Sequence, residues 1–344
     1  MTMKEILQQL ARGVPLTAEQ AESAFTEMME GTALAEHTAS LLTFLAMREP
    51  TVEELAGAAT VMRRHAVAID APENVIDTCG TGGVGSDFFN VSTAAAIVAA
   101  AAGATVAKHG NRSVTSKSGS SDVLRALGVN IDTTPEQEAA CLREAGICFA
   151  FAPRHHPAMK YVQPIRQSLG FSTVFNILGP LTNPAGARRQ LVGTRSAGLA
   201  DKLLEVLVRL GAVRAMVVSG VDISAGPVCE ISITGPTHVA QFDAGEGGAK
   251  HYSLSPADFG FRYEASEELS VRSPEESAAK IKAILAGTSG APRDIVVINA
   301  AAALWVGSAA ASMSEGLVKA AAAIDSGRAA RTLETLVACS RAAV

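Results

Sequence analysis

The chain has 344 residues and a net charge of −5, with 48% hydrophobic and 18% charged residues. This length suffices for one large or two ordinary domains with a real core, and the composition is globular rather than disordered. The acidic balance disfavours nucleic acid or an anionic membrane as a partner. Aromatic residues make up only 4% of the chain. Because alanine is abundant instead, we expect many close-packed helices around a core of small side chains.

The cysteines indicate a reducing compartment. There are five of them, an odd number, and no two form a Cys-x-x-Cys pair. The N-terminus lacks the apolar core of a signal peptide. The longest apolar run, 93–107, is rich in alanine and shorter than the roughly 20 residues that a membrane-spanning helix needs. We therefore expect a cytoplasmic protein without membrane association.

Residues 1–70 are predicted to form an all-helical segment. Thr17 with Gln20, and Thr51 with Glu54, each have the spacing of a capping box at the start of a helix. The segment carries no chemistry of its own. We expect it to serve packing, including packing against a second copy of the chain.

Strand and helix signals alternate after the first 70 residues, which predicts parallel βαβ units with right-handed crossovers. A polar, glycine-rich stretch interrupts this alternation at 243–250. The fold class expected from this pattern is α/β, a mainly parallel central sheet flanked by helices, next to the small all-helical domain. The predicted strands are 75–77, 104–108, 147–151, 190–194, 215–218 and 239–242. The predicted helices are 92–102, 121–127, 135–144, 157–169, 198–210 and 273–285, with a buried segment from 292–303 and helix to the end.

A glycine loop, Gly80, Gly82 and Gly85, follows the first predicted strand and precedes a helix. The G-x-G-x-x-G spacing alone is a weak signal, since it is compatible with a dinucleotide site, a phosphate site or a tight structural turn. A dinucleotide fold needs an acid at the end of the second strand to hold the ribose. This chain has Lys108-His109 there, which favours phosphate, and the structural turn stays open.

The phosphate interpretation has a physical basis. Glycines allow backbone N–H groups to face a ligand, and the helix that starts at Ser92-Thr93 adds unpaired N–H groups and the positive end of its dipole. Asn90, Ser92 and Thr93 add neutral donors, and Lys108 adds a charge. The loop 116–121 supplies further hydroxyl groups. So many donors suit more than one phosphate, such as a pyrophosphate.

A series of longer motifs follows in order along the chain. They are GTGG (80–83), FNVST (89–93), KHGNR (108–112), KSGSSDVL (117–124), RHHPA (154–158), VFNILGPLTNP (174–184), EISITGPT (230–237) and INAAAALWV (298–306). With these motifs, the chain closely resembles the anthranilate phosphoribosyltransferases over nearly its whole length. The resemblance implies transfer of phosphoribosyl from phosphoribosyl pyrophosphate to anthranilate, with release of pyrophosphate, in tryptophan biosynthesis. It also implies Mg²⁺ and a homodimer.

The resemblance also implies a domain division. A helical domain covers 1–70 and is completed by helices from about 157–185. The α/β domain, which binds phosphoribosyl pyrophosphate, comprises 71–156 and 186–344. The homodimer is expected to form through the helical domain.

Site residues follow from the matched motifs. No single catalytic residue is assigned; Lys108 and His109 are expected to stabilise the transition state as pyrophosphate leaves. Arg166 suits a carboxylate, unless it is a helix-surface cation. His109 and His156 are alternatively core histidines. The residues implied for phosphoribosyl pyrophosphate are Gly80, Gly82, Gly83, Asn90, Ser92, Thr93, Lys108 and Ser120. Those implied for anthranilate are Gly80, His109, Asn111, His156, Arg166 and Gly179.

The chain departs from the family pattern where that pattern places acids. Val84 follows GTGG where the family usually has Asp, and Cys229-Glu230 matches an Asp-Glu pair that binds Mg²⁺. Ser219-Gly220 replaces a common His-Gly. Since Mg²⁺ prefers hard oxygen ligands and a thiolate is soft, we expect a weakened metal site.

Other oxygen ligands remain near these departures. The Ser92 hydroxyl and Glu230 are the implied metal ligands. Asp87, and Asp222 in an apparently lengthened segment, are further oxygen donors that could compensate.

Two other functions stay open from the sequence. Gly82-Gly83-Val84-Gly85 partly echoes the glycine loop of pyrimidine nucleoside phosphorylases, which use phosphate without Mg²⁺. A non-catalytic paralogue that binds nucleic acid is the second alternative, and the acidic balance counts against it. The sequence does not separate anthranilate from related aromatic acids as the acceptor.

Overall fold

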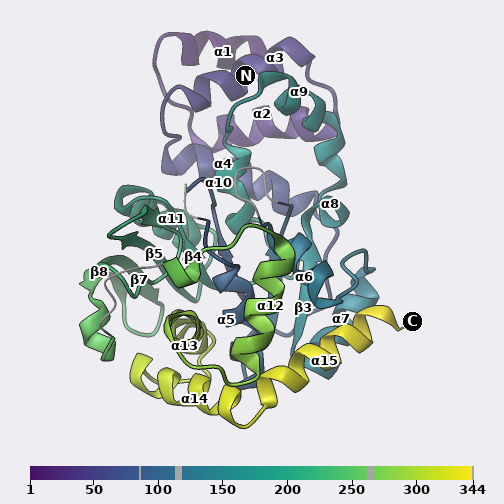
Figure 1. The fold of residues 1–344 in the computed structure, drawn as a ribbon. Helices are drawn as coiled ribbons and strands as arrows, with labels where there is room; N and C mark the ends of the chain where they lie inside the picture. Colours follow the sequence, from purple (N-terminus) through teal and green to yellow (C-terminus); the bar gives the residue numbers. More distant parts are fainter. Residues whose placement is uncertain (85–86, 113–117, 262–266, 343–344) are drawn as a thin grey trace.

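A layer of four helices forms one end of the molecule in the computed structural model, and an α/β body forms the rest (Figure 1). The structure describes residues 1–84, 87–112, 118–261 and 267–342. Gly85 of the glycine loop, and Ser116 and Lys117 of the serine-rich loop, lie outside these residues. The four helices of the layer are α1 (Met3–Ala11), α2 (Ala18–Glu30), α3 (Ala35–Ala46) and α4 (Val52–Arg64).

Both capping boxes predicted from the sequence are present. The Thr17 hydroxyl accepts from the backbone of Gln20 at the start of α2, and the Gln20 side chain accepts from the Thr17 backbone. Thr51 and Glu54 repeat this exchange at the start of α4. These pairs satisfy N–H groups that a helix start leaves unpaired, so the two helix starts are fixed by local sequence.

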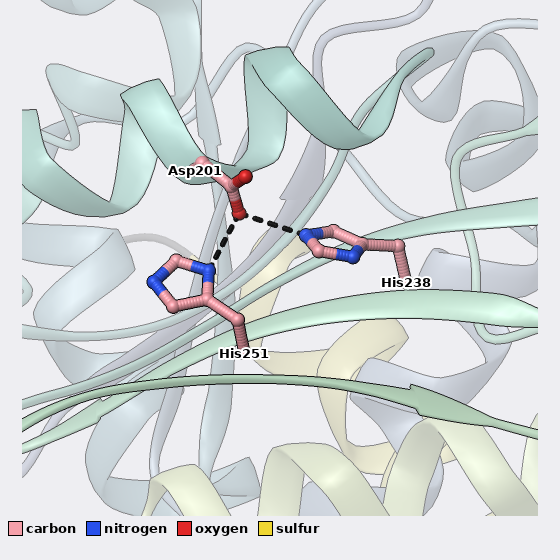
Figure 2. A group of neighbouring side chains, drawn as sticks. All are labelled: Asp201, His238 and His251. Atoms are coloured by element: carbon pink, nitrogen blue, oxygen red, sulfur yellow. Dashed lines mark hydrogen bonds and ion pairs between the residues drawn. The ribbon is translucent and has the colours of Figure 1, made fainter.

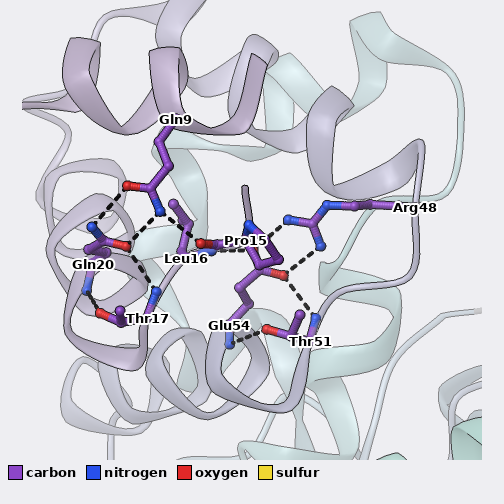
Figure 3. Close-up of polar contacts among 8 residues, drawn as sticks. All are labelled: Gln9, Pro15, Leu16, Thr17, Gln20, Arg48, Thr51 and Glu54. Atoms are coloured by element: carbon purple, nitrogen blue, oxygen red, sulfur yellow. Dashed lines mark hydrogen bonds and ion pairs between the residues drawn. The ribbon is translucent and has the colours of Figure 1, made fainter. Parts of the chain in front are cut away.

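Glu54 is also the centre of a wider polar network in the helical layer (Figure 3). Its carboxylate accepts from the backbone N–H of Leu16 at 2.9 Å and pairs with two Arg48 nitrogens at 2.9 and 2.6 Å. The Glu54 side chain is buried. Burial alone would raise the pKa of this carboxyl, but the hydrogen bonds from Arg48, Leu16 and Thr51 outweigh it and lower the pKa of Glu54. The network therefore stabilises the ionised form.

The α/β body is built on one eight-stranded sheet with the order β3-β2-β1-β4-β5-β7-β8, in which β6 pairs with β5. Strands β1 to β5 run parallel, whereas β6, β7 and β8 pair antiparallel with their neighbours. The sheet is thus mainly parallel, as predicted. The strands are β1 (Ile76–Gly80), β2 (Val106–Gly110), β3 (Ile147–Phe151), β4 (Arg189–Gly193), β5 (Arg214–Asp222), β6 (Gly226–Val228), β7 (Thr237–Asp243) and β8 (Gly248–Leu254).

Two hydrophobic cores lie on opposite faces of the sheet. Along β5, Ala215 and Val217 belong to the core shared with the helical layer, whereas Met216 and Val218 belong to the other core. This alternation follows from the period of two of a strand. The helices of the body are α5 (Val91–Ala101), α6 (Ser120–Leu127), α7 (Pro135–Ala145), α11 (Ala197–Arg209), α12 (Pro274–Leu285), α13 (Ala291–Val306), α14 (Met313–Asp325) and α15 (Arg328–Arg341).

A segment between β3 and β4 connects the two parts of the molecule. Its side chains, among them Val162, Val174 and Phe175, pack in the same core as those of α1 to α4. Figure 1 shows α9 and α10 beside the helical layer. The elements are α8 (Ala152–His155), the 3₁₀ turn η1 (Pro157–Tyr161), α9 (Gln163–Leu169), α10 (Phe175–Leu178) and the 3₁₀ turn η2 (Gly179–Leu181).

Strand order reverses between β1 and β4. The chain proceeds from β1 outward to β2 and β3, and then returns to place β4 on the other side of β1. In open α/β sheets, ligands bind in the crevice at the carboxyl ends of the strands on either side of such a switch point. The glycine loop after β1 lies at this position.

The edge of the sheet differs from the sequence prediction. Strand β8 begins inside the polar, glycine-rich stretch 243–250, where no strand was expected, and β6 was also not predicted. All seven residues of β8 are exposed or half-buried, and four successive ones, 248–251, are exposed. Such an edge strand lacks the apolar alternation on which strand prediction depends. Among the described helices, none has the length and apolar character needed to cross a bilayer.

Glu54→Gln should lower the free energy of unfolding by about 2 kcal/mol at neutral pH, because it removes the charge from a buried, hydrogen-bonded pair. The pKa of Glu54 is lower in the folded chain, so its contribution is complete above the ordinary glutamate pKa of about 4.3 and is lost as pH falls through the folded value. Denaturant unfolding, followed by circular dichroism between pH 3 and 8, measures the free energy of unfolding and its dependence on pH. Glu30→Gln, on an exposed side chain, is the control; equal curves for both variants would contradict the prediction.

Candidate active site

A cavity of about 690 Å³ opens at the carboxyl ends of β1 and β2, beneath the helical layer. Nearly all the residues predicted for the site line it. Thr93 is the exception: it is buried beside the cavity. The predicted residues that line it are Gly80, Gly82, Gly83, Asn90, Ser92, Lys108, His109, Asn111, Ser120, His156, Arg166, Gly179, Cys229 and Glu230.

The glycine loop turns at Gly82 and Gly83, whose φ angles are +62° and +77°. A Cβ at either position would meet no atom within 4 Å. Glycine is therefore required there by the left-handed backbone rather than by crowding. The loop is anchored to the sheet where the N–H of Thr81 donates to the carbonyl of Gly193 at 2.9 Å.

Two helices begin at the cavity without a side-chain cap. The N-cap residue of α5, Asn90, makes no side-chain cap bond, and that of α6 is Gly119. One N–H at each start donates to a backbone carbonyl instead, Val91 to Phe89 and Ser121 to Asn111. The Asn90 side chain is occupied elsewhere: it accepts from the Thr93 hydroxyl at 2.8 Å and donates to the Ser118 carbonyl at 2.8 Å. Thr93 therefore positions Asn90. Two uncapped helix starts at one cavity make a strong site for an anion.

Lys108 lies buried at the centre of the site, with 3% of its surface exposed. Its ammonium group donates to the Thr78 carbonyl at 2.5 Å and to the Ser92 hydroxyl at 3.1 Å. Burial lowers the pKa of Lys108, and the negative charges of Asp77 and Glu230 act against that shift. The side chain is thus held as a fixed donor at the end of β2.

Asp77, which the sequence analysis did not identify, lies behind the cavity lining and supports His109. Its carboxylate is fully buried in β1 and accepts from the backbone N–H of His109 in β2 at 3.1 Å. Burial raises the pKa of Asp77, while Lys108 and hydrogen bonds lower it. An acid inside a predicted buried strand was the available signal, because such a group requires a partner.

His109 and His156 form a neutral pair on one wall of the cavity. Their ring centroids are 5.2 Å apart, and both side chains are buried. Burial lowers the pKa of His109 to about 3 and that of His156 to about 4. His109 Nδ1 lies 3.1 Å from the Gly179 carbonyl, so this nitrogen carries the proton and donates. Within the described residues, Nε2 of each ring is buried without a partner.

Arg166 reaches the cavity from α9. Its guanidinium lies 5.2 Å from the centroid of the Phe175 ring and donates to the side-chain oxygens of Asn176 and Gln163, each at 3.3 Å. Burial lowers the pKa of Arg166. No carboxylate pairs with it among the described residues. The arrangement presents an oriented cation without a counter-charge, which suits a carboxylate ligand.

Cys229 and Glu230 enter the site because two strand glycines let their backbone approach. A Cβ at Gly193 would lie 1.6 Å from the Cys229 carbonyl oxygen, and one at Gly220 would lie 2.3 Å from that of Glu230. Burial raises the pKa of Cys229 to about 12 and that of Glu230 to about 7. The Cys229 thiol is therefore protonated, and its sulfur lies 3.8 Å from the Gly82 carbonyl.

Asp87 and Asp222, the two acids that could compensate for the missing ones, do not line the cavity. Asp222 caps the β5–β6 turn instead: its Oδ1 accepts from Ser224 and from the N–H of Ala225, and its Oδ2 accepts from the Thr234 hydroxyl at 2.6 Å. The backbone carbonyl of Asp87 accepts from Val271. Of the oxygen-bearing side chains predicted to bind the metal, Glu230 and Ser92 line the cavity, together with the apolar Val84.

Comparison with known proteins decides the family. A model described as the helical bundle domain of a glycosyl transferase family matches residues 4–66, and the α/β-domain model of that family matches residues 72–330. An anthranilate phosphoribosyltransferase from Rubrobacter xylanophilus is 49% identical over 340 residues, which cover 98% of each chain. The chain belongs to the anthranilate phosphoribosyltransferase family.

Solved structures of the family have the same fold. The enzyme from Thermus thermophilus gives a TM-score of 0.89 at 38% identity, covering 98% of this chain and 99% of the other. The Saccharomyces cerevisiae enzyme in complex with PRPP and Mg gives 0.86 at 28% identity, covering 98% and 97%. The same yeast enzyme in complex with 4-fluoroanthranilate gives 0.85 at 26% identity, with the same coverage. The family fold is thus a helical domain beside an α/β domain, as predicted.

Proposed function

We propose that this chain transfers a phosphoribosyl group from phosphoribosyl pyrophosphate to the amino group of anthranilate, which releases pyrophosphate and serves tryptophan biosynthesis. One observation carries the assignment. A single cavity combines an anion-binding end, formed by two uncapped helix starts and Lys108, with a second cation, Arg166, held on a separate helix. The relatives and the yeast complexes support both substrates.

The pyrophosphate end comprises the glycine loop, the starts of α5 and α6, and Lys108. Backbone N–H groups and the helix dipoles favour the negative charge that develops on pyrophosphate as it leaves. Ser92 and Ser120 add hydroxyl donors from the same two helix starts. Asn90 is oriented toward this end by its bonds to Thr93 and Ser118.

The acceptor end comprises Arg166, Asn111, His109, His156 and Gly179. Arg166 would bind the anthranilate carboxylate. His109 donates through Nδ1 to the Gly179 carbonyl, so its Nε2 presents a lone pair that can accept an N–H of the anthranilate amine. This hydrogen bond orients the amine lone pair toward the sugar.

The reaction needs positioning more than strong bases. The amine nitrogen forms a bond to the anomeric carbon while the bond from that carbon to pyrophosphate breaks. The nitrogen, now positively charged, then passes a proton to water or to the departing pyrophosphate. With a pKa of about 3, His109 is too weak a base to take that proton fully. The rate therefore depends on alignment of the two substrates and on stabilisation of the leaving group.

The residues present fit one Mg²⁺ ion in part. Mg²⁺ is commonly held by one or two carboxylates together with substrate phosphates and water. Glu230 has a raised pKa of about 7 because it is buried, and a cation beside it would favour its charged form. Glu230 and the Ser92 hydroxyl would hold the ion, which would neutralise pyrophosphate charge. The protonated Cys229 thiol does not fit this role, so the site is weaker than one with two acids.

The assembly and domain division are part of the same proposal. Residues 157–185 complete the helical domain, and their packing against α1 to α4 supports this. The domain also carries exposed apolar side chains, Leu34 at 56% and Met47 at 79%, which favour a homodimer through it. The five free cysteines favour a cytoplasmic location.

Sedimentation velocity of the purified chain should give the mass of a dimer. A monomer at all concentrations would contradict the proposed homodimer.

When purified protein is mixed with phosphoribosyl pyrophosphate, Mg²⁺ and anthranilate, the fluorescence of anthranilate should decrease as anthranilate is converted.

Arg166→Ala should raise the KM for anthranilate about 10- to 100-fold, because a charge-assisted hydrogen-bonded pair is lost, and should change the KM for phosphoribosyl pyrophosphate little. Arg143→Ala, on an exposed side chain of α7, is the matched control. An equal effect of Arg166→Ala on both constants would contradict the assigned role of Arg166. Absence of turnover, with phosphorolysis of a pyrimidine nucleoside or tight binding of nucleic acid instead, would contradict the function.

Cys229→Asp should lower the Mg²⁺ concentration needed for half-maximal velocity by about tenfold, because it adds a hard oxygen ligand beside Glu230. Cys229→Asn has the same shape without the charge and is the matched control. An additional Val84→Asp substitution should strengthen the effect. Equal Mg²⁺ dependence of wild type, Cys229→Asp and Cys229→Asn would show that position 229 does not contribute to the metal site.

A further inference from the structure

Away from the cavity, Asp201, His238 and His251 bring three metal-ligating side chains together (Figure 2). Oδ1 of Asp201 lies 2.7 Å from Nε2 of His238 and 2.7 Å from Nδ1 of His251. The ligand atoms all lie within 4.8 Å of one another, and the described residues contain no other group of three such side chains. The two histidines lie 37 and 50 positions from Asp201 in sequence, so no local motif reveals the group.

The fold holds the three residues on separate but fixed elements. His238 of β7 pairs with Ser253 of β8, and His251 of β8 pairs with Ala240 of β7. The histidines are therefore diagonal neighbours on one face of the hairpin, with ring centroids 6.2 Å apart. Asp201 projects toward them from α11, which covers that face (Figure 2).

Helix α11 is firmly anchored at this point. Ala200 and Leu203, on either side of Asp201, are completely buried in the core beneath the helix. The position of the Asp201 backbone is thus fixed relative to the sheet. Only the three side chains need to rotate to accommodate a ligand.

The donor set is that of a transition metal. Two imidazole nitrogens and one carboxylate oxygen suit Zn²⁺ and related ions, whereas Mg²⁺ prefers oxygen ligands alone. With metal–ligand bonds of about 2.0–2.1 Å, tetrahedral ligand atoms lie about 3.3 Å apart. The two contacts of 2.7 Å would need to open by roughly half an ångström to reach this geometry.

The side chains have the freedom for that change. The exposed fractions are 44% for Asp201, 27% for His238 and 46% for His251. An ion can enter from solvent, and water can complete its coordination. We propose that Asp201, His238 and His251 form a binding site for a divalent transition-metal ion of the zinc class. The ion would link α11 to β7 and to the exposed edge strand β8.

This site is chemically distinct from the magnesium position in the cavity. The two sites share no residue. The side chains proposed for Mg²⁺, Ser92 and Glu230, offer only oxygen atoms, whereas this group offers two nitrogen atoms and one oxygen. Binding needs a lone pair on His238 Nε2 and on His251 Nδ1, so each proton that now bonds to Asp201 moves to the other ring nitrogen or to solvent. The carboxylate then exchanges two hydrogen bonds for one metal bond.

Zn²⁺ titration of the full chain, freed of metal by a chelator and kept in excess Mg²⁺, tests the proposal by calorimetry. One Zn²⁺ should bind per chain, and Zn²⁺ should raise the melting temperature. His251→Gln and Asp201→Asn should each weaken binding at least about tenfold and remove the thermal shift. His37→Gln, a half-buried histidine of α3, is the matched control and should bind as wild type does. Transferase turnover of His251→Gln should be unchanged.

Several results would overturn it. If the wild type shows no heat of Zn²⁺ binding and no change in melting temperature, the proposal is refuted. The three side chains would then form only a hydrogen-bonded cluster. Binding that survives His251→Gln and Asp201→Asn, or that is lost in Glu230→Gln instead, would place the ion elsewhere. The absorption spectrum of the wild-type chain with bound Co²⁺ gives a test that does not depend on whether the variants fold. Bands typical of tetrahedral Co²⁺ with nitrogen and oxygen ligands would support the proposal, and bands typical of octahedral Co²⁺ with oxygen ligands alone would contradict it.

Discussion

The buried ammonium of Lys108 is the interaction on which the site depends. It donates to the Thr78 carbonyl and to the Ser92 hydroxyl, so one side chain joins β1, β2 and the start of α5. Desolvation lowers the pKa of Lys108, and the charges of Asp77 and Glu230 act in the opposite direction. A buried cation with two nearby carboxylates is costly unless every partner is in place. The cavity is therefore a charged arrangement in which the helix starts favour an anion at one end and Arg166 favours a carboxylate at the other.

The sheet topology explains why these groups meet. Because strand order reverses between β1 and β4, the loops after β1 and β2 and the segment after β5 diverge around a common crevice. Close backbone contacts then fix the details. Gly193 and Gly220 allow Cys229 and Glu230 to approach the strand ends more closely than any residue with a Cβ would permit. The backbone of Cys229 is thus placed by these two glycines, whatever the chemistry of its side chain.

Sequence patterns predicted the parts of the fold that are locally determined. Capping boxes at Thr17 and Thr51, and the alternation of strands and helices, follow from short-range spacing and appear in the structure. Most of the residues predicted for the site came from motifs that the fold brings together, and these residues line one cavity. No sequence pattern indicated that Asp77 would contact the His109 backbone or that Thr93 would lie behind the lining and bond to Asn90, because both positions depend on partners distant in the pattern. Strand β8 and the Asp201–His238–His251 group were missed because pairing across the sheet, rather than local pattern, creates them.

A crystal structure of the chain with phosphoribosyl pyrophosphate, Mg²⁺ and anthranilate tests these assignments most directly. The pyrophosphate should contact Lys108 and the starts of α5 and α6, and the anthranilate carboxylate should contact Arg166. The amine should lie within hydrogen-bond distance of His109 Nε2. Pyrophosphate density away from Lys108, or an anthranilate carboxylate bound without Arg166, would contradict them.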